Sequence, residues 1–327
     1  MSINVKKRVI GVDIDVTETT VAVVDLRGEI IAKSSFPTTD YPNVNNFGEA
    51  LSQEIIRLAE QNGGYETIRS VGVSSHSGNY MTGCIENAGN LPWKGVVPLS
   101  AMLRDRIGLA VAVGNNLHAE ALGEYAFGSA HGMQNFVVVS LGRVGMGCFI
   151  FSNGQPYLGT DGFAGELGHC CMVENGRHCN CGRYGCLEEY VSERGIIQTA
   201  REVIAERSEP SLLRDLPELT PMAVGACCDQ GDTLAIETYR RTGQILGFGL
   251  AFCATIMNPE AIILTGSLTR TSRWLIPSAQ ESFEEHVFHN IRNRVKLVIS
   301  NLDIRERNVL GASVMAWDEK EYSLFKE

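Results

Sequence analysis

Hydrophobic and polar positions along the chain fall into short blocks that predict alternating strands and helices. Apolar runs rich in Val and Ile, bounded by Gly, Asn or Asp, are typical of strands. They predict strands at Arg8–Asp15, Thr19–Leu26, Glu29–Phe36, Ile68–Ser74, Ala110–Val113, Phe136–Leu141, Cys148–Phe151, Ala261–Leu264 and Val295–Ile299. Apolar residues at helical spacing predict helices at Asn46–Gln61, Leu117–Ala126, Thr233–Met257, Trp274–Phe288 and Val309–Trp317.

One arrangement of these elements occurs twice. A strand, a turn, a second strand, a tight turn and a third strand begin near position 8 and again near position 136. Arg27-Gly28 and Asn153-Gly154 supply the tight turns, since both pairs suit a short hairpin connection. A duplicated unit predicts two similar α/β lobes. We place the boundary near Asn115, so that residues 1–115 with about 305–327 form one lobe and residues 116–304 form the other.

Composition narrows the class of protein further. The chain has 327 residues, 44% of them hydrophobic and 20% charged, which is typical of a globular protein of about two domains. Its net charge is -10, whereas binding of nucleic-acid phosphates needs a surface rich in Lys and Arg. We therefore do not expect direct nucleic-acid binding. No apolar stretch is long enough to suggest a membrane span or a signal peptide, so we expect a cytoplasmic protein.

The most specific local signal is a cluster of metal-binding residue types. His169 is followed by Cys179, Cys181 and Cys186, all within 18 positions. Thiolates and imidazole suit tetrahedral zinc, and four protein ligands make a closed structural site. Gly182 and Gly185 permit the turns that would bring the sulfurs together. The alternative is a loop of free thiols; the spacing favours structural zinc.

The residues around this cluster resemble a family signature. Gly165-Glu166-Leu167-Gly168-His169 followed by Cys179-Asn180-Cys181-Gly182 and then Gly185-Cys186-Leu187-Glu188 is similar to that of the ROK family of bacterial sugar kinases and sugar-responsive repressors. The resemblance implies an α/β fold of two RNase H-like lobes, of the actin/hexokinase (ASKHA) type, with a structural zinc loop. This agrees with the duplicated hairpins. It also implies a monosaccharide or sugar phosphate as ligand and a homo-oligomer such as a homodimer.

The same resemblance implies a set of sugar contacts. Carboxylates accept strong hydrogen bonds from hydroxyls, and a metal-bound imidazole can donate from its second nitrogen. Asn90 lies in Asn-Leu-Pro, where the family places a sugar contact, although an Asn before Pro also suits an ordinary turn. The implied substrate-binding residues are Asn90, Asn115, Asn116, Glu166, His169 and Glu188.

The catalytic pattern of the family is broken. Active members carry Asn-Asp-Ala-Asn, whose Asp takes the proton from the attacking hydroxyl. Ala121-Leu122-Gly123-Glu124 sets the register and places Asn116 at that general-base position. An amide does not accept a proton near neutral pH, and loss of a general base typically costs about 10²–10⁴-fold in rate. Asn116 can still hydrogen-bond a sugar hydroxyl.

The nucleotide-facing loops also depart from the family. The first, normally Asp-x-Gly-Gly-Thr, has lost both glycines, and the second carries Arg143, Val144 and Met146 where Thr and two glycines are usual. Side chains obstruct the close approach of backbone N–H groups to phosphate. The degenerate nucleotide-binding residues are Asp13 (expected near Mg²⁺), Asp15, Thr17, Gly142, Arg143, Gly145 and Gly266. We hypothesise that Asp15 pairs with Arg143 in place of phosphate.

Three functions follow from these patterns. The first is a ROK-family sugar-binding protein, a pseudokinase or sugar sensor, with impaired catalysis. The second is an active ATP-dependent hexose kinase that uses ATP and Mg, with Glu120 or Asp13 as its base. The third is a ROK-type transcriptional regulator without its own helix-turn-helix, since a kinase-type strand is predicted from Arg8 onward.

Overall fold

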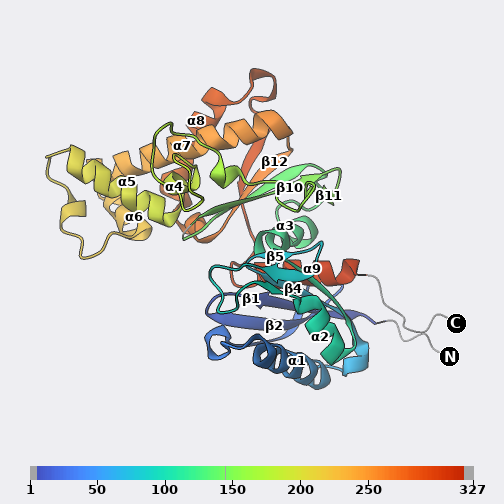
Figure 1. The fold of residues 1–327 in the computed structure, drawn as a ribbon. Helices are drawn as coiled ribbons and strands as arrows, with labels where there is room; N and C mark the ends of the chain where they lie inside the picture. Colours follow the sequence, from blue (N-terminus) through green and yellow to red (C-terminus); the bar gives the residue numbers. More distant parts are fainter. Residues whose placement is uncertain (1–5, 144, 320–327) are drawn as a thin grey trace. The chain divides into compact units, whose positions relative to one another are not determined.

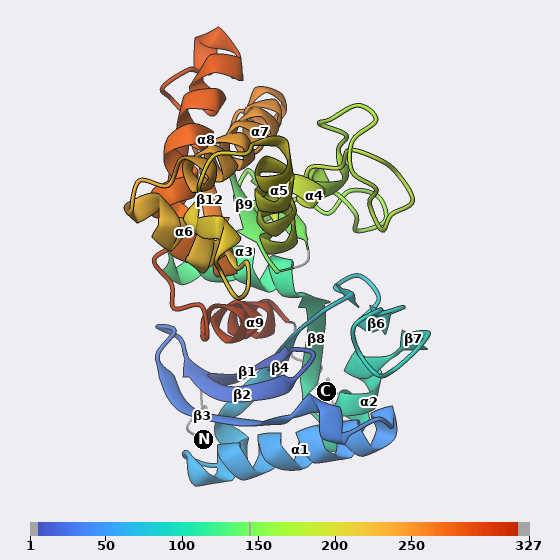
Figure 2. The same ribbon diagram turned by 90° about the vertical axis from the view of Figure 1, so that its left-hand side faces the viewer.

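The computed structural model describes residues 6–143 and 145–319 of the chain. Contacts between Cα atoms divide the chain into two compact units. The first unit contains residues up to His131 together with those from Leu302 onward, and the second contains Gly132–Asn301. Figures 1 and 2 show the elements that make up each unit. No helix in the described part of the chain is long and apolar enough to cross a membrane.

The first unit is built on a five-stranded sheet with the strand order β3-β2-β1-β4-β8. The first three strands form antiparallel pairs, and β1, β4 and β8 run parallel. Their bounds are β1 Arg8–Ile14, β2 Glu18–Asp25, β3 Ile30–Pro37, β4 Ile68–Ser75 and β8 Ala110–Asn115. A separate small sheet contains β5 Gly78–Asn79, β6 Cys84–Glu86 and β7 Val96–Val97.

Helices cover both faces of the larger sheet (Figure 2). The amphipathic helix α1 (Val44–Gln61) buries Phe47, Leu51 and Ile55, and α2 (Leu99–Ile107) lies beside it. On the opposite face lie α9 (Arg307–Asp318) and, packed against it, α3 (Asn116–Phe127). Helix α9 follows the second unit in the chain but completes the core of the first.

The second unit repeats the sheet of the first. Its strand order is β11-β10-β9-β12-β13, with antiparallel pairs among the first three strands and parallel pairs from β9 onward. The bounds are β9 Phe136–Leu141, β10 Met146–Ser152, β11 Gln155–Pro156, β12 Ala261–Thr265 and β13 Lys296–Ile299. The duplication read from the sequence is therefore confirmed, and Asn153 and Gly154 both have the positive φ that the hairpin turn requires.

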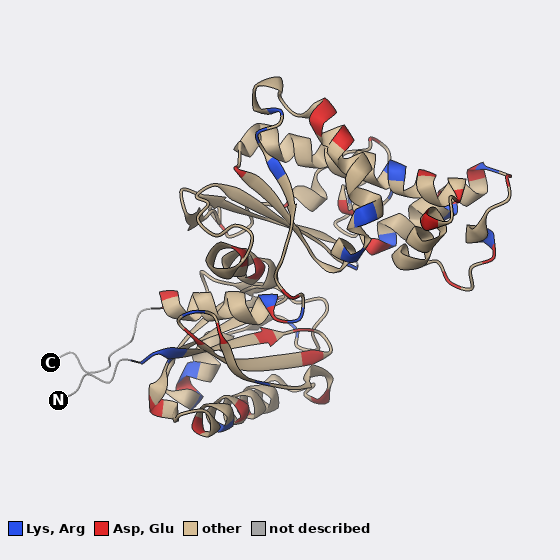
Figure 3. Cartoon of the chain, turned by 180° about the vertical axis from the view of Figure 1, so that it is seen from behind, with Lys and Arg blue, Asp and Glu red and all other residues tan. Residues whose placement is uncertain are grey.

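Helices α4 (Glu188–Val191), α5 (Glu193–Glu206), α6 (Pro221–Asp229), α7 (Thr233–Met257) and α8 (Ser272–His286) pack on this second sheet and on one another. Short 3-10 helices occur in both units. They are Thr38–Asp40, Tyr65–Thr67, Leu167–His169, Leu212–Arg214, Ser267–Thr271 and His289–Ile291. On the face drawn in Figure 3, Lys and Arg are interspersed with Asp and Glu in both units.

The expected lobe boundary differs from the division of the structure. A boundary near Asn115 assigns α3 to the second lobe, whereas the compact units divide after His131 and before Leu302. The reason is packing: α3 and α9 approach so closely that a Cβ placed on Gly311 would lie 1.6 Å from the carbonyl oxygen of Ala119. Residues 116–131 therefore belong with the first sheet.

Candidate sugar and metal site

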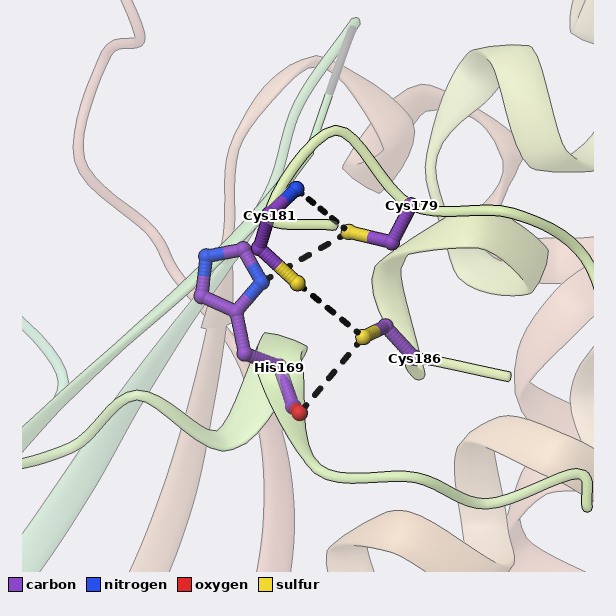
Figure 4. A group of neighbouring side chains, drawn as sticks. All are labelled: His169, Cys179, Cys181 and Cys186. Atoms are coloured by element: carbon purple, nitrogen blue, oxygen red, sulfur yellow. Dashed lines mark hydrogen bonds between the residues drawn. The ribbon is translucent and has the colours of Figure 1, made fainter. Parts of the chain in front are cut away.

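Four side chains in the second unit form a compact thiol–imidazole cluster (Figure 4). The Cys181 and Cys186 sulfurs lie 3.6 Å apart, and Nδ1 of His169 lies 3.8 Å from Sγ of Cys179. One ligand atom from each of the four residues lies within 4.8 Å of the others. Sulfurs bound to one tetrahedral zinc ion at about 2.3 Å are about 3.8 Å apart, so the donor types and spacing fit zinc.

The loop that carries the cysteines is held by its own backbone. The amide of Gly182 donates to the carbonyl of Cys179, and the amide of Cys179 donates to the carbonyl of Arg183. Gly185 has φ +73°, and a Cβ there would lie 1.8 Å from the carbonyl oxygen of Val173. Only glycine fits at this position, which is the role that the sequence predicted for it.

The three thiols of the cluster differ in how readily they ionise. The side chain of Arg183 lowers the pKa of the Cys181 thiol to about 6, while burial raises the pKa values of Cys179 and Cys186. A thiolate is the form that binds metal, and a divalent ion would stabilise it at the two buried sulfurs. Cys179 with Glu188 and Glu189 forms a second group at metal-binding distances. The four-residue cluster fits better, because Glu189 is already paired with Arg194 at 2.6 Å.

Two carboxylates flank the imidazole of His169. Oε1 of Glu188 lies 3.4 Å from Nδ1, and Oε2 of Glu166 lies 3.8 Å from Nε2. Nδ1 therefore faces the sulfurs, and Nε2 faces the more exposed carboxylate. The structure brings together three of the residues that the sequence assigned to sugar contacts, with acceptors and a donor suited to hydroxyl groups. Glu188 also lies close to Gly145, where a Cβ would be 2.6 Å from Oε2.

The remaining predicted sugar contacts lie in the first unit. Asn115 caps helix α3, since its side-chain oxygen accepts from the amide of Leu117 at 2.9 Å. Asn116 is the first residue of that helix, at the carboxyl edge of β8. Asn90 is exposed in a loop anchored by Trp93, whose indole donates to the carbonyl of Tyr41. The contacts of these residues with a sugar stay predictions.

Asp13 is held at the carboxyl edge of β1. Ser74 donates to one of its oxygens at 2.8 Å and Asn308 donates to the other at 3.2 Å. Burial raises the pKa of this carboxyl to about 6 despite these two bonds. Asp13 is therefore neutral in a large fraction of molecules at mildly acidic pH, and a bound cation would favour its charged form.

Asp15 has a partner that the sequence analysis did not single out. Nε2 of His76 lies 3.1 Å from its carboxylate, which lowers the pKa of Asp15 and raises that of His76. His76 directly follows β4, at the same edge of the sheet as Asp13 and Asn115. The rule that functional side chains gather at the carboxyl ends of parallel strands could have identified it. The pairing of Asp15 with Arg143 stays a prediction, since these residues belong to different units.

The second and third nucleotide loops lie side by side. The carbonyl of Gly142 accepts from the amide of Glu193, and that of Arg143 accepts from the amide of Arg194. Gly266 has φ +87°, and a Cβ there would lie 2.3 Å from the carbonyl oxygen of Leu141. Val144 lies outside the described residues. Thr17, in the first loop, is exposed, and its carbonyl accepts from the amide of Thr38.

Comparison with known proteins agrees with the duplicated sheets and the signature cluster. The model of the ROK family matches residues 9–319. The chain is 30% identical over 311 residues to a glucokinase of Halalkalibacterium halodurans, covering 92% of both chains. A crystal structure of a ROK family glucokinase from Streptomyces griseus in complex with glucose and AMPPNP superposes with a TM-score of 0.75 at 26% identity, covering 95% of this chain and 100% of that one.

A transcriptional regulator is also similar. The crystal structure of a ROK family transcriptional regulator, a homologue of the E. coli MLC protein, has a TM-score of 0.83 at 25% identity and covers 95% of this chain and 78% of that one. The fold and the relatives thus define a class that contains sugar kinases and regulators. The chain belongs to the ROK family.

Proposed function

We propose that this protein binds a monosaccharide through a ROK-type sugar site and that its phosphotransfer is strongly impaired. The observation that supports this proposal is Asn116 at the first turn of α3, in the position where active family members carry their general-base Asp. A primary amide holds no proton-accepting group near neutral pH. A sugar could therefore bind while the attack on a phosphoryl group lacks its base.

The two substitute bases considered from the sequence are engaged elsewhere. Glu120 is buried, and its carboxylate lies 3.7 Å from the guanidinium of Arg307. Asp13 accepts hydrogen bonds from Ser74 and Asn308. A general base must reach the proton that it removes, within about 2.6–3.2 Å or through one water. The present partners of both carboxylates compete with that task.

The sugar contacts of the proposal rely on the cluster in the second unit. We propose zinc as the ion held by His169, Cys179, Cys181 and Cys186, because the sulfur and nitrogen donors suit it. The ion would fix the imidazole through Nδ1 and leave Nε2 to donate to a hydroxyl. Glu166 and Glu188 would accept from neighbouring hydroxyls, which are bonds strengthened by their charge.

Calorimetry and a coupled ADP-release assay on the same preparation test the proposal. Glucose and N-acetyl hexosamines should bind with a 1:1 stoichiometry, while ADP release stays near background. Asn116→Asp should raise the rate by about 10²–10⁴-fold if the missing base is the main defect. Asn115→Asp is the matched control, one residue away, and should not raise it. Wild-type turnover in the ordinary range of about 1–10³ s⁻¹ would refute the proposal.

The second candidate is an active ATP- and Mg-dependent hexose kinase. The 30% identity to a glucokinase across 92% of both chains favours it. In that case we propose His76 as the base, because its ring is held by Asp15 and is one-third exposed. His76→Asn would then lower turnover by about 10²–10⁴-fold and leave sugar affinity unchanged. Equal turnover of wild type and His76→Asn would exclude His76 from this role.

A further inference from the structure

A fourth cysteine lies directly against the thiol–imidazole cluster. Cys171 and Cys186 are opposite each other in an isolated antiparallel bridge. Cys186 belongs to the four-residue cluster, whereas Cys171 does not. Its thiol is exposed, and that of Cys186 is fully buried. The neighbour of Cys171 in the chain, Cys170, is also exposed but has no place in the bridge.

The hydrogen bonds define the kind of bridge. The amide of Met172 donates to Gly185 at 2.9 Å, and the amide of Leu187 donates to Cys170 at 3.0 Å. These bonds flank the two cysteines, which exchange none with each other, so they form a non-hydrogen-bonded antiparallel pair. Such pairs have Cα atoms about 4.5 Å apart and side chains on the same face. Disulfides span Cα separations of about 4.4–6.8 Å, so this backbone can accept one.

The position of the Cys171 sulfur agrees with this geometry. It lies 3.1 Å from the place that a Cβ would occupy on Gly185, the residue next to Cys186. It also lies 3.6 Å from the carbonyl oxygen of Val173. The sulfur therefore lies beside the segment that carries Cys186.

We propose that Cys171 and Cys186 are a redox pair that releases the metal when a peroxide oxidises the protein. Hydrogen peroxide converts the exposed Cys171 thiol into a sulfenic acid with release of one water. The Cys186 thiolate, released from the ion that it would bind, then attacks the Cys171 sulfur. The S–S bond forms, the S–O bond breaks, and the leaving hydroxide takes a proton from solvent to become a second water. In sum, one thiol, one thiolate, one peroxide and one proton give one disulfide and two waters.

The consequence for the cluster follows from its ligand set. A disulfide sulfur is not a thiolate, so the ion loses one of four ligands. His169 then loses the bond that fixes its ring. This last step rests on the proposed sugar site: oxidation should abolish sugar binding, and a thiol reductant together with zinc should restore it. The disulfide itself does not depend on what the protein binds.

Peptide mapping and metal release test the pair together. Trypsin cleavage after Arg183 and Arg194 leaves Cys186 as the one cysteine of its peptide. Cleavage after Arg143 and Arg177 puts Cys170 and Cys171 in another peptide together with Cys148, and fragmentation of the linked pair should place the bond at Cys171. After peroxide treatment, these two peptides should be linked, and one equivalent of zinc should appear with a chromogenic chelator. Cys171→Ser should slow zinc release by at least about tenfold, because the variant lacks the thiol that would form the disulfide with Cys186.

Cys170→Ser is the matched control, since it alters the adjacent exposed thiol and should release zinc at the wild-type rate. Equal release from Cys171→Ser and wild type, or a disulfide that joins Cys181 to Cys186 instead, would overturn the proposal. Mapping the zinc-free protein in parallel tests the disulfide even if no zinc is bound. Zinc content and sugar affinity before oxidation report separately on the metal site and on the proposed function.

Discussion

Replacing Asp13 by Asn should remove a pH-dependent loss of stability. The pKa of Asp13 is raised from 3.8 to about 6 by burial. Between pH 3.8 and about 6, the carboxyl therefore still binds a proton in the folded state but has lost it in the unfolded chain. Its contribution to stability is therefore greatest at low pH and falls as the pH rises through 6. The full shift is worth about 3 kcal/mol, at about 1.36 kcal/mol per pKa unit.

The accessible part of this effect lies between pH 5 and pH 8. At pH 5 protonation of Asp13 stabilises the folded state by about 1.4 kcal/mol and the unfolded state hardly at all. At pH 8 the carboxyl is ionised in both states, so protonation stabilises neither of them. The stability of Asp13→Asn relative to wild type should therefore increase by about 1.4 kcal/mol over this interval. An amide at position 13 can keep both neighbours, because Ser74 and Asn308 can each donate or accept.

Urea unfolding of both proteins at several pH values, in buffer without added divalent ions, measures this difference. Asp303→Asn is the matched control. The amide of Arg305 donates to Asp303 and lowers its pKa, so that carboxyl is fully charged throughout the interval. Its relative stability should not change with pH. A flat difference for Asp13→Asn, or one that falls as the pH rises, would refute the assignment of Asp13 as a desolvated acid.

Three further predictions concern the second unit. Gly266→Ala should lower Tm far more than the control Gly132→Ala. Both glycines have positive φ, but only at position 266 would a Cβ lie 2.3 Å from the carbonyl oxygen of Leu141. Similar Tm changes in the two variants would contradict this. A strong chelator should lower the Tm of wild type and leave that of Cys179→Ser unchanged, because the variant lacks a ligand. Arg177→Met should cost about 1.5–3 kcal/mol in urea unfolding, since the half-buried guanidinium bonds Glu202 and two backbone carbonyls and lies over a tyrosine ring. A loss below about 1 kcal/mol would argue against this anchoring role.

Much of the fold could be predicted because local signals agreed with one another. The strand Phe136–Leu141 and the helix Thr233–Met257 were predicted with the bounds that the structure gives them. The Val- and Ile-rich runs and the Asn-Pro break after Met257 were strong local signals. The helix Leu99–Ile107 was not predicted, because its polar and apolar residues show only weak amphipathic spacing.

The candidate site was predictable where it depended on residues close in sequence. The thiol–imidazole cluster spans 18 positions, and the side chains meet as its spacing suggested. The partner of Asp15 was not predictable in this way. His76 is 61 positions away, and the two meet only because β1 and β4 are neighbours in a parallel sheet. The residue pattern of one segment does not show which residue from a distant segment will lie beside it in the fold.

The place of α9 in the first unit has a consequence for how the chain folds during synthesis. Its backbone lies so close to β1 and β4 that a Cβ on Gly11 or Gly72 would lie about 2 Å from a carbonyl oxygen of the helix. Until residues 307–318 leave the ribosome, the strand positions that α9 covers, Val9, Ala22 and Val24, have no apolar partner from this helix. The continuous segment 132–301 is therefore expected to reach its native state first, and the amino-terminal part waits for the last helix to arrive.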